Sequence, residues 1–183
     1  DIYINHVISN NTSTDFDTNE YTDSSGITYI SMMFKSGTST ITFNEDIEVD
    51  YLVVGGGGSG SIYLNHDPGN ASYEPNYGAA GGGGAGQLID VANATLTSGE
   101  YTITIGDGGT VGSSSGSNGS DSSIVYNSTT TIANAVGGQY GHTIGDGVNA
   151  SYRNGVLNAQ NPQGGESGNG YVGGRGENSD GLR

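Results

Sequence analysis

The chain has 183 residues, of which 35 are glycine, and its formal net charge is −15 with only four Lys and Arg residues. So few cations exclude the basic surfaces that nucleic acids and anionic membranes require, and no apolar run approaches the roughly 20 residues that cross a bilayer. The absence of cysteine excludes disulfides and thiolate metal sites.

Short runs of β-branched and apolar residues predict an all-β fold of short antiparallel strands. No segment shows a helical period. The predicted strands cover, in chain order, residues 2–4, 7–8, 27–34, 38–43, 47–54, 87–91, 101–105, 123–126 and 130–133. The last two are predicted to form a hairpin across Asn127-Ser128-Thr129, and beyond Val136 the regular patterning fades.

Two glycine runs, 55–60 and 78–86, each adjoin an apolar strand. Glycine in a regular position is destabilising by roughly 0.5–1 kcal/mol relative to alanine, so a fold that keeps this many must use the bare backbone. Polyproline II strips can bond to one another laterally only when no side chain intervenes. We therefore predict packed, polyproline-II-like glycine segments between the strands. Flexible linkers are the alternative.

The order of these motifs resembles the viral glycine-rich domain family of phage tail-fibre and virion-surface proteins. The matching motifs are Thr40–Phe43 with Ile47–Gly58, Gly81–Gly86, Gly99–Gly109, Asn118–Ser120 with Ser123-Ile124, and Gly137-Gly138. The resemblance covers about residues 38–140. It divides the chain into an N-terminal β arm (1–37), a glycine-rich β domain (38–140) and a glycine-rich C-terminal extension (141–183).

This resemblance implies a non-enzymatic structural protein, extracellular or on a virion surface, that serves display, adhesion or assembly. Similar tail-tip adhesins stack polyglycine helices as a sandwich and bind host receptors through loops. The implied partners are copies of the chain, other virion or fibre proteins, and host-surface glycans. Two alternatives stay open. One is a filament subunit that donates the strand at residues 2–8 to a neighbour. The other is a carbohydrate- or ice-binding module.

Two strings resemble enzyme motifs but lack the context that their chemistry needs. Gly55-x-Gly57-x-x-Gly60 follows a strand as a dinucleotide fingerprint does, yet no helix is predicted after it to hold a pyrophosphate. The segment 112–116 matches a nucleophile elbow but continues as a Ser/Gly tract. We expect no catalytic residues and no organic cofactor.

The acidic segment before residue 26 offers one candidate metal site. Asp15, Asp17, Asn19 and Asp23 echo a calcium loop, although Glu20 and Gly26 occupy the places that an EF-hand gives to Gly and Glu. An irregular Ca²⁺ site and a plain polar loop both fit this pattern.

Two sets of surface residues are candidates for modification and recognition. Asn-x-Ser/Thr sequons, which are glycan acceptors if the chain meets a glycosylating machinery, occur at Asn10, Asn11, Asn70, Asn93, Asn118, Asn127 and Asn149. Tyrosines in pliable glycine-rich segments, which are typical of adaptable recognition loops, are Tyr73, Tyr77, Tyr140, Tyr152 and Tyr171. The alternative for these tyrosines is that their rings cap a thin core.

Overall fold

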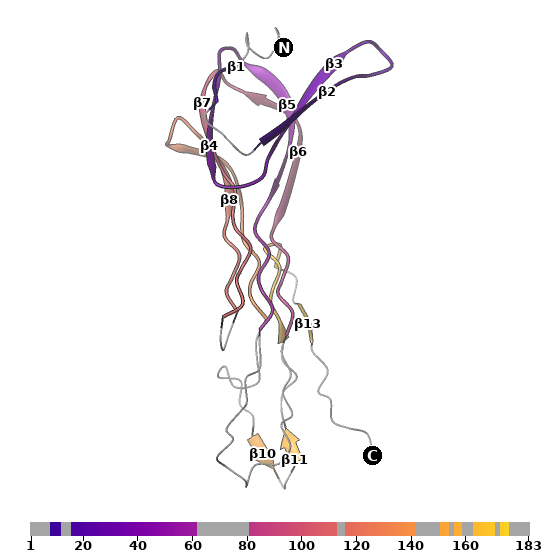
Figure 1. Ribbon diagram of the computed structural model, residues 1–183, viewed down its shortest axis with the longest axis vertical. Coiled ribbons are helices and arrows are strands. Elements are labelled where there is room, and N and C mark those ends of the chain that lie inside the picture. Colours follow the sequence, from indigo (N-terminus) through magenta and orange to yellow (C-terminus); the bar gives the residue numbers. More distant parts are fainter. Residues whose placement is uncertain are drawn as a thin grey trace.

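The computed structural model describes residues 8–11, 16–61, 81–112, 116–141, 151–153, 156–158, 163–170 and 173–175. The molecule is elongated, with β-sheets at one end and glycine-rich segments that run from them along the long axis (Figure 1). Every regular element among these residues is an antiparallel strand, which confirms the predicted all-β class. The described residues contain no helix that is long and apolar enough to cross a membrane.

The largest sheet has five antiparallel strands in the order β1-β4-β7-β8-β9. The bounds are β1 Ile8–Asn11, β4 Thr38–Phe43, β7 Gly99–Thr104, β8 Ser122–Tyr126 and β9 Thr130–Ala135. The predicted β8–β9 hairpin is confirmed, and Asn127 and Ser128 in its turn have positive φ angles of 46° and 56°. Such angles suit the right-handed twist of a tight hairpin. β1 pairs with β4 of its own chain, whereas residues 1–7 of the proposed donated strand lie outside the described residues.

A second layer is the ribbon of β5 (Ile47–Val54) and β6 (Leu88–Leu96). Residues 47–54 form a strand as predicted, but β6 continues beyond the predicted end at residue 91. The ladder shifts register between Val49 and Tyr51, and Asn93 adopts a φ of 54° beside this irregularity. The Asp50 carboxylate accepts the Asn93 amide at 2.8 Å. A bulge therefore lets β6 continue where its alternation is broken.

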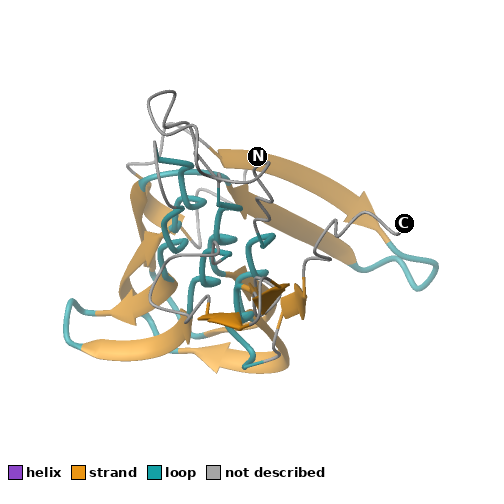
Figure 2. Cartoon of the chain, turned by 90° about the horizontal axis from the view of Figure 1, so that it is seen from below, coloured by secondary structure: helices purple, strands orange, loops and turns teal. Residues whose placement is uncertain are grey.

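A third ribbon, of β2 (Phe16–Thr22) and β3 (Thr28–Phe34), projects from the body of the molecule (Figures 1 and 2). The Asp23 carboxylate closes its turn by accepting the amides of Ser25 and Ile27 at 2.8 and 2.9 Å. Two smaller pairs join β10 (Ser151–Arg153) to β11 (Val156–Asn158) and β12 (Gln163–Gly164) to β13 (Gly173–Arg175).

The core between the five-stranded sheet and the β5–β6 ribbon narrows toward the glycine segments. Its wide part is formed by Ile41, Phe43, Leu96 and Tyr101, all buried. The pKa of Tyr101 is raised mainly by burial of its hydroxyl, and the neighbouring Tyr126 raises it further. Its narrow part is formed by Val53, Ala133 and Ala135. The buried side chains shrink until, from Gly55 onward, the backbones themselves are in contact.

Candidate functional site

Six glycine-rich strips among the described residues form one hydrogen-bonded array below the sheets. We number them in chain order: first 55–61, second 81–87, third 106–110, fourth 116–120, fifth 136–141 and sixth 165–168. Figure 2 looks along the long axis and shows the glycine segments as coils that lie side by side, with strands around them. The prediction that the glycine runs pack together is confirmed.

The bonds between the first and second strips recur at every third residue. They join the amides of Gly55, Gly58 and Ser61 to the carbonyls of Gln87, Gly84 and Gly81, at 2.9, 2.8 and 3.2 Å. Because a polyproline II helix has three residues per turn, residues three apart lie on the same side of it. The spacing is therefore that of two antiparallel polyproline-II-like strips in lateral contact.

The remaining bonds order the strips in two layers of three. The third, first and second strips form one layer, and the fourth, fifth and sixth form the other. The first and fifth strips are the centre, since each bonds to four others. These two run parallel, with the amides of Gly138 and Gly141 donating to the carbonyls of Gly56 and Ser59, both at 2.9 Å.

Contact between strips leaves no room for a Cβ atom at the inner positions. A Cβ added at Gly58 would lie under 3.0 Å from the Gln139 carbonyl, and one at Gly83 would meet the Gly58 carbonyl as closely. The neighbouring Gly57 and Gly82 are different. A Cβ at Gly57 would lie 3.7 Å from its nearest neighbour, and one at Gly82 would meet nothing within 4 Å.

The exposed face of the first layer contains these tolerant positions. Gly57 and Gly82 are exposed, and Ala85 follows Gly82 by one three-residue turn and is also exposed. Ala85, the alanine within residues 81–87, therefore lies on the side of the second strip where a methyl group has space. Only Ala85 adds a side chain among these three exposed positions.

The buried serine of the first strip forms hydrogen bonds to both the third and the fourth strip. Ser59 is 7% exposed, and its hydroxyl lies 3.0 Å from the Thr110 carbonyl and 3.3 Å from that of Ser117. The same oxygen accepts the Ser117 amide at 2.9 Å. A Cβ at Gly116 would meet this hydroxyl. The serine thus fills a space that a glycine opposite it leaves open.

Side chains accept two of the backbone amides of the fifth strip. The carboxylate of Asp121 accepts the Gly137 amide at 2.9 Å, and the amide oxygen of Asn118 accepts the Tyr140 amide at 2.9 Å. Asn134 also donates to Asp121 at 3.0 Å. The bond from the Gly137 amide, and then that from Asn134, lowers the pKa of Asp121. These side chains close the face that lies opposite the bare one.

Four described residues that flank long connections of the chain lie at the end of the array away from the sheets. Ser61 donates to Gly81 there, Gly141 donates to Ser59, and Gly165 donates to Gly82. The residues on either side of 62–80, and those on either side of 142–162, are thus anchored at the same end of the array. The β10–β11 hairpin, within the second segment, lies farthest from the sheets (Figure 1).

The predicted tyrosines and sequons fall in different places. Tyr140 is a half-buried part of the fifth strip, Tyr152 lies on β10, and Tyr73, Tyr77 and Tyr171 are outside the described residues. Among the sequons, Asn93 is exposed on the β6 bulge, Asn118 and Asn127 use their side-chain oxygens as acceptors, Asn10 and Asn11 lie on β1, and Asn70 and Asn149 are outside the described residues.

The proposed calcium ligands are not brought together where they are described. Asp17 pairs with Lys35 at 3.1 Å, Asp23 holds its own turn, and Asp15 is outside the described residues. Asp17 and Asp23 are separated by about 20 Å at the rise of a β-strand. The described residues include no group of three or more His, Cys, Asp and Glu that could hold a metal ion.

Neither enzyme-like string has the geometry of its motif. Gly55, Gly57 and Gly60 belong to the first strip rather than to the start of a helix. In the elbow-like segment, Gly116 bridges to Val111, and residues 113–115 are outside the described residues.

The sequence alone did not indicate the role of three residues in the array, Ser59, Asn118 and Asp121, although Asn118 was a candidate as a sequon. A signal for two of them exists. Asn118 and Asp121 are three residues apart in the sequence. The backbone amides that they accept, from Tyr140 and Gly137, are also three residues apart. The three-residue period of the strips therefore extends to their side chains. Ser59 has a weaker signal, as the single non-glycine residue in 55–60.

A protein-family model described as a glycine-rich domain matches residues 34–182. The chain therefore belongs to this glycine-rich domain family. The match extends beyond the predicted boundary at 140, in agreement with the bonds that Gly165 and Gly168 donate into the array. No curated protein and no solved structure matches the chain.

Proposed function

We propose that this member of the glycine-rich domain family is a non-enzymatic structural protein, displayed outside the cell or on a virion surface, that presents loops for adhesion. The observation that carries the proposal is that Ser61, Gly81, Gly141 and Gly165, which flank the segments 62–80 and 142–162, are bonded together at one end of the array. The sheets form the other end. The molecule is thus organised as a spacer between a base and a recognition tip.

The array suits this role because its strips are fixed by lateral backbone bonds at regular intervals. Loops held on a rigid support lose less conformational freedom when they bind, which favours affinity. In the part of the chain that the structure describes, the carboxylate of Asp121 accepts a backbone amide of the array, and that of Glu166 accepts the Gln139 side-chain amide.

The composition of the two segments indicates the partner. Both are rich in Asn and Gly; the first contains Tyr63, Tyr73 and Tyr77, and the second contains Tyr152. Tyrosine rings supply apolar area with a polar tip, while Asn supplies adaptable hydrogen bonds, and both features suit sugar rings. Because the chain has a net charge of −15, neutral glycans on a host surface are favoured over anionic ones.

The test is binding of the whole chain to a glycan array and to candidate host cells. We expect Tyr73→Ala and Tyr77→Ala each to weaken binding by at least about tenfold, since hot-spot tyrosines contribute roughly 1.4 kcal/mol or more. Leu52→Ala is the control, because Leu52 is 60% exposed on β5 at the sheet end. Failure of the wild-type chain to bind any glycan or cell, or equal loss with Leu52→Ala, would contradict the proposal.

A second candidate, binding to ice or to a flat carbohydrate surface, is favoured by the bare face of the first layer. Gly57 of the first strip and Gly82 and Ala85 of the second are exposed there, and a Cβ has space at Gly57 and Gly82. Gly82→Lys places a long side chain on this face at a position with free space. If the face binds ice, inhibition of ice recrystallisation by the wild-type chain should disappear in this variant. An inactive wild-type chain would remove this candidate.

A further inference from the structure

The β2–β3 ribbon lies almost entirely before the family domain, which begins at residue 34. It forms a two-stranded sheet, and within the described residues neither strand has another partner. Figures 1 and 2 show it extending away from the body of the molecule. Two-stranded ribbons are marginal in water by themselves, and three or more strands are normally required for independent stability.

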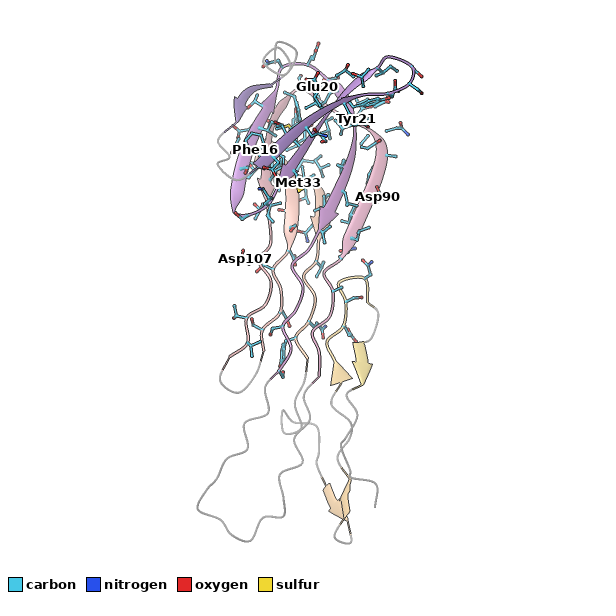
Figure 3. All side chains as sticks on the ribbon, turned by 45° about the vertical axis from the view of Figure 1, so that its right-hand side comes forward. Phe16, Glu20, Tyr21, Met33, Asp90 and Asp107 are labelled. Carbon is cyan, nitrogen blue, oxygen red and sulfur yellow. The ribbon has the colours of Figure 1, made fainter. Side chains whose placement is uncertain are left out.

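The ribbon exposes several large apolar side chains. Tyr21 is 53% exposed, Tyr29 43% and Met33 62%. Tyr21 and Tyr29 stack across the two strands with ring centroids 5.1 Å apart. Figure 3 shows Tyr21 and Met33 on this projecting element. Water still reaches much of this surface, so covering it would be favourable.

β3 lacks the features that normally protect a sheet edge. Its seven residues, Thr28–Phe34, include no charge, proline or glycine, and its pairing with β2 has no register shift. By contrast, β2 contains Asp17 and Glu20, and the β5–β6 ladder has a bulge. Natural edges are usually blocked by charges, prolines or bulges, because an open edge accepts another strand.

We infer that β3 is the contact between two copies of this chain, which pair through it antiparallel about a twofold axis. The product is a four-stranded sheet in the order β2-β3-β3-β2. It continues the β2–β3 ladder that the single chain already forms. In such an isologous contact the same surface serves both copies.

The sequence of β3 is self-complementary in this arrangement. With Ser31 on the axis, Ile30 faces Met32 of the second copy, and Tyr29 faces its Met33. Each apolar residue next to the axis thus meets another, and the Tyr–Met contact is favourable in itself. Opposed residues of antiparallel strands share a face, so the exposed Tyr29 and Met33 become neighbours.

Charge also favours a second copy at this edge over other contacts between copies. Two chains of net charge −15 repel each other. Pairing through β3 brings together strands without charges and leaves the carboxylates of Asp17 and Glu20 on the outer strands. The adhesion proposal does not depend on this inference, although a dimer would present two tips and raise avidity.

Covalent trapping gives the first test. The chain has no cysteine, so Ser31→Cys introduces a single thiol at the axis. Mild oxidation should convert most of this variant to a disulfide-linked dimer. Asn19→Cys is the matched control, because Asn19 pairs with Ser31 on the outer strand. Its copies would be about 14 Å apart at the usual strand spacing, too far for a disulfide. Equal trapping of both variants, or of neither, would overturn the inference.

Sedimentation with a second matched pair gives an independent test. The wild-type mass should double as protein concentration rises, and added salt should lower the concentration required. Ser31→Lys should remain a monomer because two like charges would meet on the axis, whereas Asn19→Lys should dimerise as the wild type does. Equal thermal midpoints for the two lysine variants, measured at a protein concentration low enough for both to be monomers, exclude unfolding as the cause. A wild-type chain that stays monomeric, or a Ser31→Lys variant that dimerises, would refute the contact.

Discussion

The sheet end and the glycine array of this molecule differ in what lies between their layers of backbone. In the sheets, side chains such as Phe43 and Tyr101 fill the space between two layers of backbone. In the array, the layers contact each other directly, and the space that a side chain would need is occupied by a neighbouring carbonyl. Sheets normally stack about 10 Å apart, so the chain passes from side-chain packing to backbone packing along its length.

The residues of β5 show how the two regions are joined. Along one face of this strand, Ile47 and Val49 pack on the wide core, Tyr51 and Val53 pack on the narrow core, and Gly55 begins the array. Burial continues, but its source changes from apolar area to backbone hydrogen bonds. At the sheet end, the loss of one methylene group from a side chain should therefore lower the free energy of unfolding. In the array, the gain of one methyl group should lower it.

The largest expected effect is that of a methyl group inside the array. Gly58→Ala should destabilise the chain by about 3 kcal/mol, because its Cβ would meet the Gln139 carbonyl and displace the bond from Gly58 to Gly84. Gly57→Ala, one residue away, should be neutral or stabilising by about 0.4–1 kcal/mol, since the site has space and alanine restricts the unfolded chain. Denaturant unfolding of both variants measures the difference.

The pair Gly83→Ala and Gly82→Ala repeats this comparison in the second strip. Equal effects at the inner and outer glycines of both pairs would mean that the array is not packed as described.

The next effect concerns a hydroxyl rather than a methyl group. Ser59→Ala should cost about 1.5 kcal/mol, because it removes the buried hydroxyl that bonds to the Thr110 carbonyl and accepts the Ser117 amide. The Ser117 amide keeps its backbone bond to the Thr110 carbonyl at 3.1 Å, so the expected loss is that of the bonds of the hydroxyl alone. Ser61→Ala is the comparison on the same strip, where the side chain is only half-buried. Urea midpoints measured side by side should rank the two variants in this order, and a reversed ranking would contradict the role given to Ser59.

A smaller effect is expected at the sheet end. Tyr101→Phe keeps the ring in the core but removes the hydroxyl, which donates to the Thr97 carbonyl at 2.8 Å. The loss should be about 1 kcal/mol, as for a single neutral hydrogen bond. Tyr51→Phe provides a partly buried reference with no bond of this kind among the described residues. A thermal shift as small as that of Tyr51→Phe would show that the bond contributes nothing.

The smallest effect depends on pH. The pKa of Asp121 is lowered in the folded chain, so its carboxylate contributes to the free energy of unfolding. This contribution is fully present above the pKa of the unfolded chain, about 3.9, and is lost as pH falls through the lower pKa of the folded chain. Asp121→Asn keeps an acceptor oxygen but cannot be protonated. The stability gap between wild type and this variant should therefore narrow on acidification from pH 6 to about pH 2, near the limit of typical carboxyl titration. A gap that widens would contradict the assignment.

Much of the fold could be predicted because each of its signals is local. Period-two alternation located β4, β5 and β7, two short apolar runs across a turn located the β8–β9 hairpin, and glycine next to apolar strands indicated packed strips. The neighbours of each strip could not be predicted, since glycines carry no side-chain pattern that distinguishes one strip from another. Ala85 and Ser59 are informative exceptions, because each non-glycine residue marks the side of its strip where an atom has room.

The candidate site was predicted less completely. The tyrosine-containing segments were identified from composition, yet their attachment at one end depends on bonds between residues far apart, such as Gly165 and Gly82. For Tyr140, a glycine-rich neighbourhood suggested a loop, whereas the residue belongs to a strip. Loops and strips have the same glycine-rich composition, and only the lateral hydrogen bonds distinguish a strip from a loop.

Amide hydrogen exchange across the first strip shows whether the strips are bonded to one another. We expect protection with a period of three. The amides of Gly55, Gly58 and Ser61 should exchange slowly because they bond to the second strip, and those of Gly56 and Ser59 should exchange slowly because they bond to the fourth. Gly57 and Gly60 have no amide acceptor among the described residues and should exchange fastest. Uniformly rapid exchange from residue 55 to 61 would show that the strips are not bonded to one another.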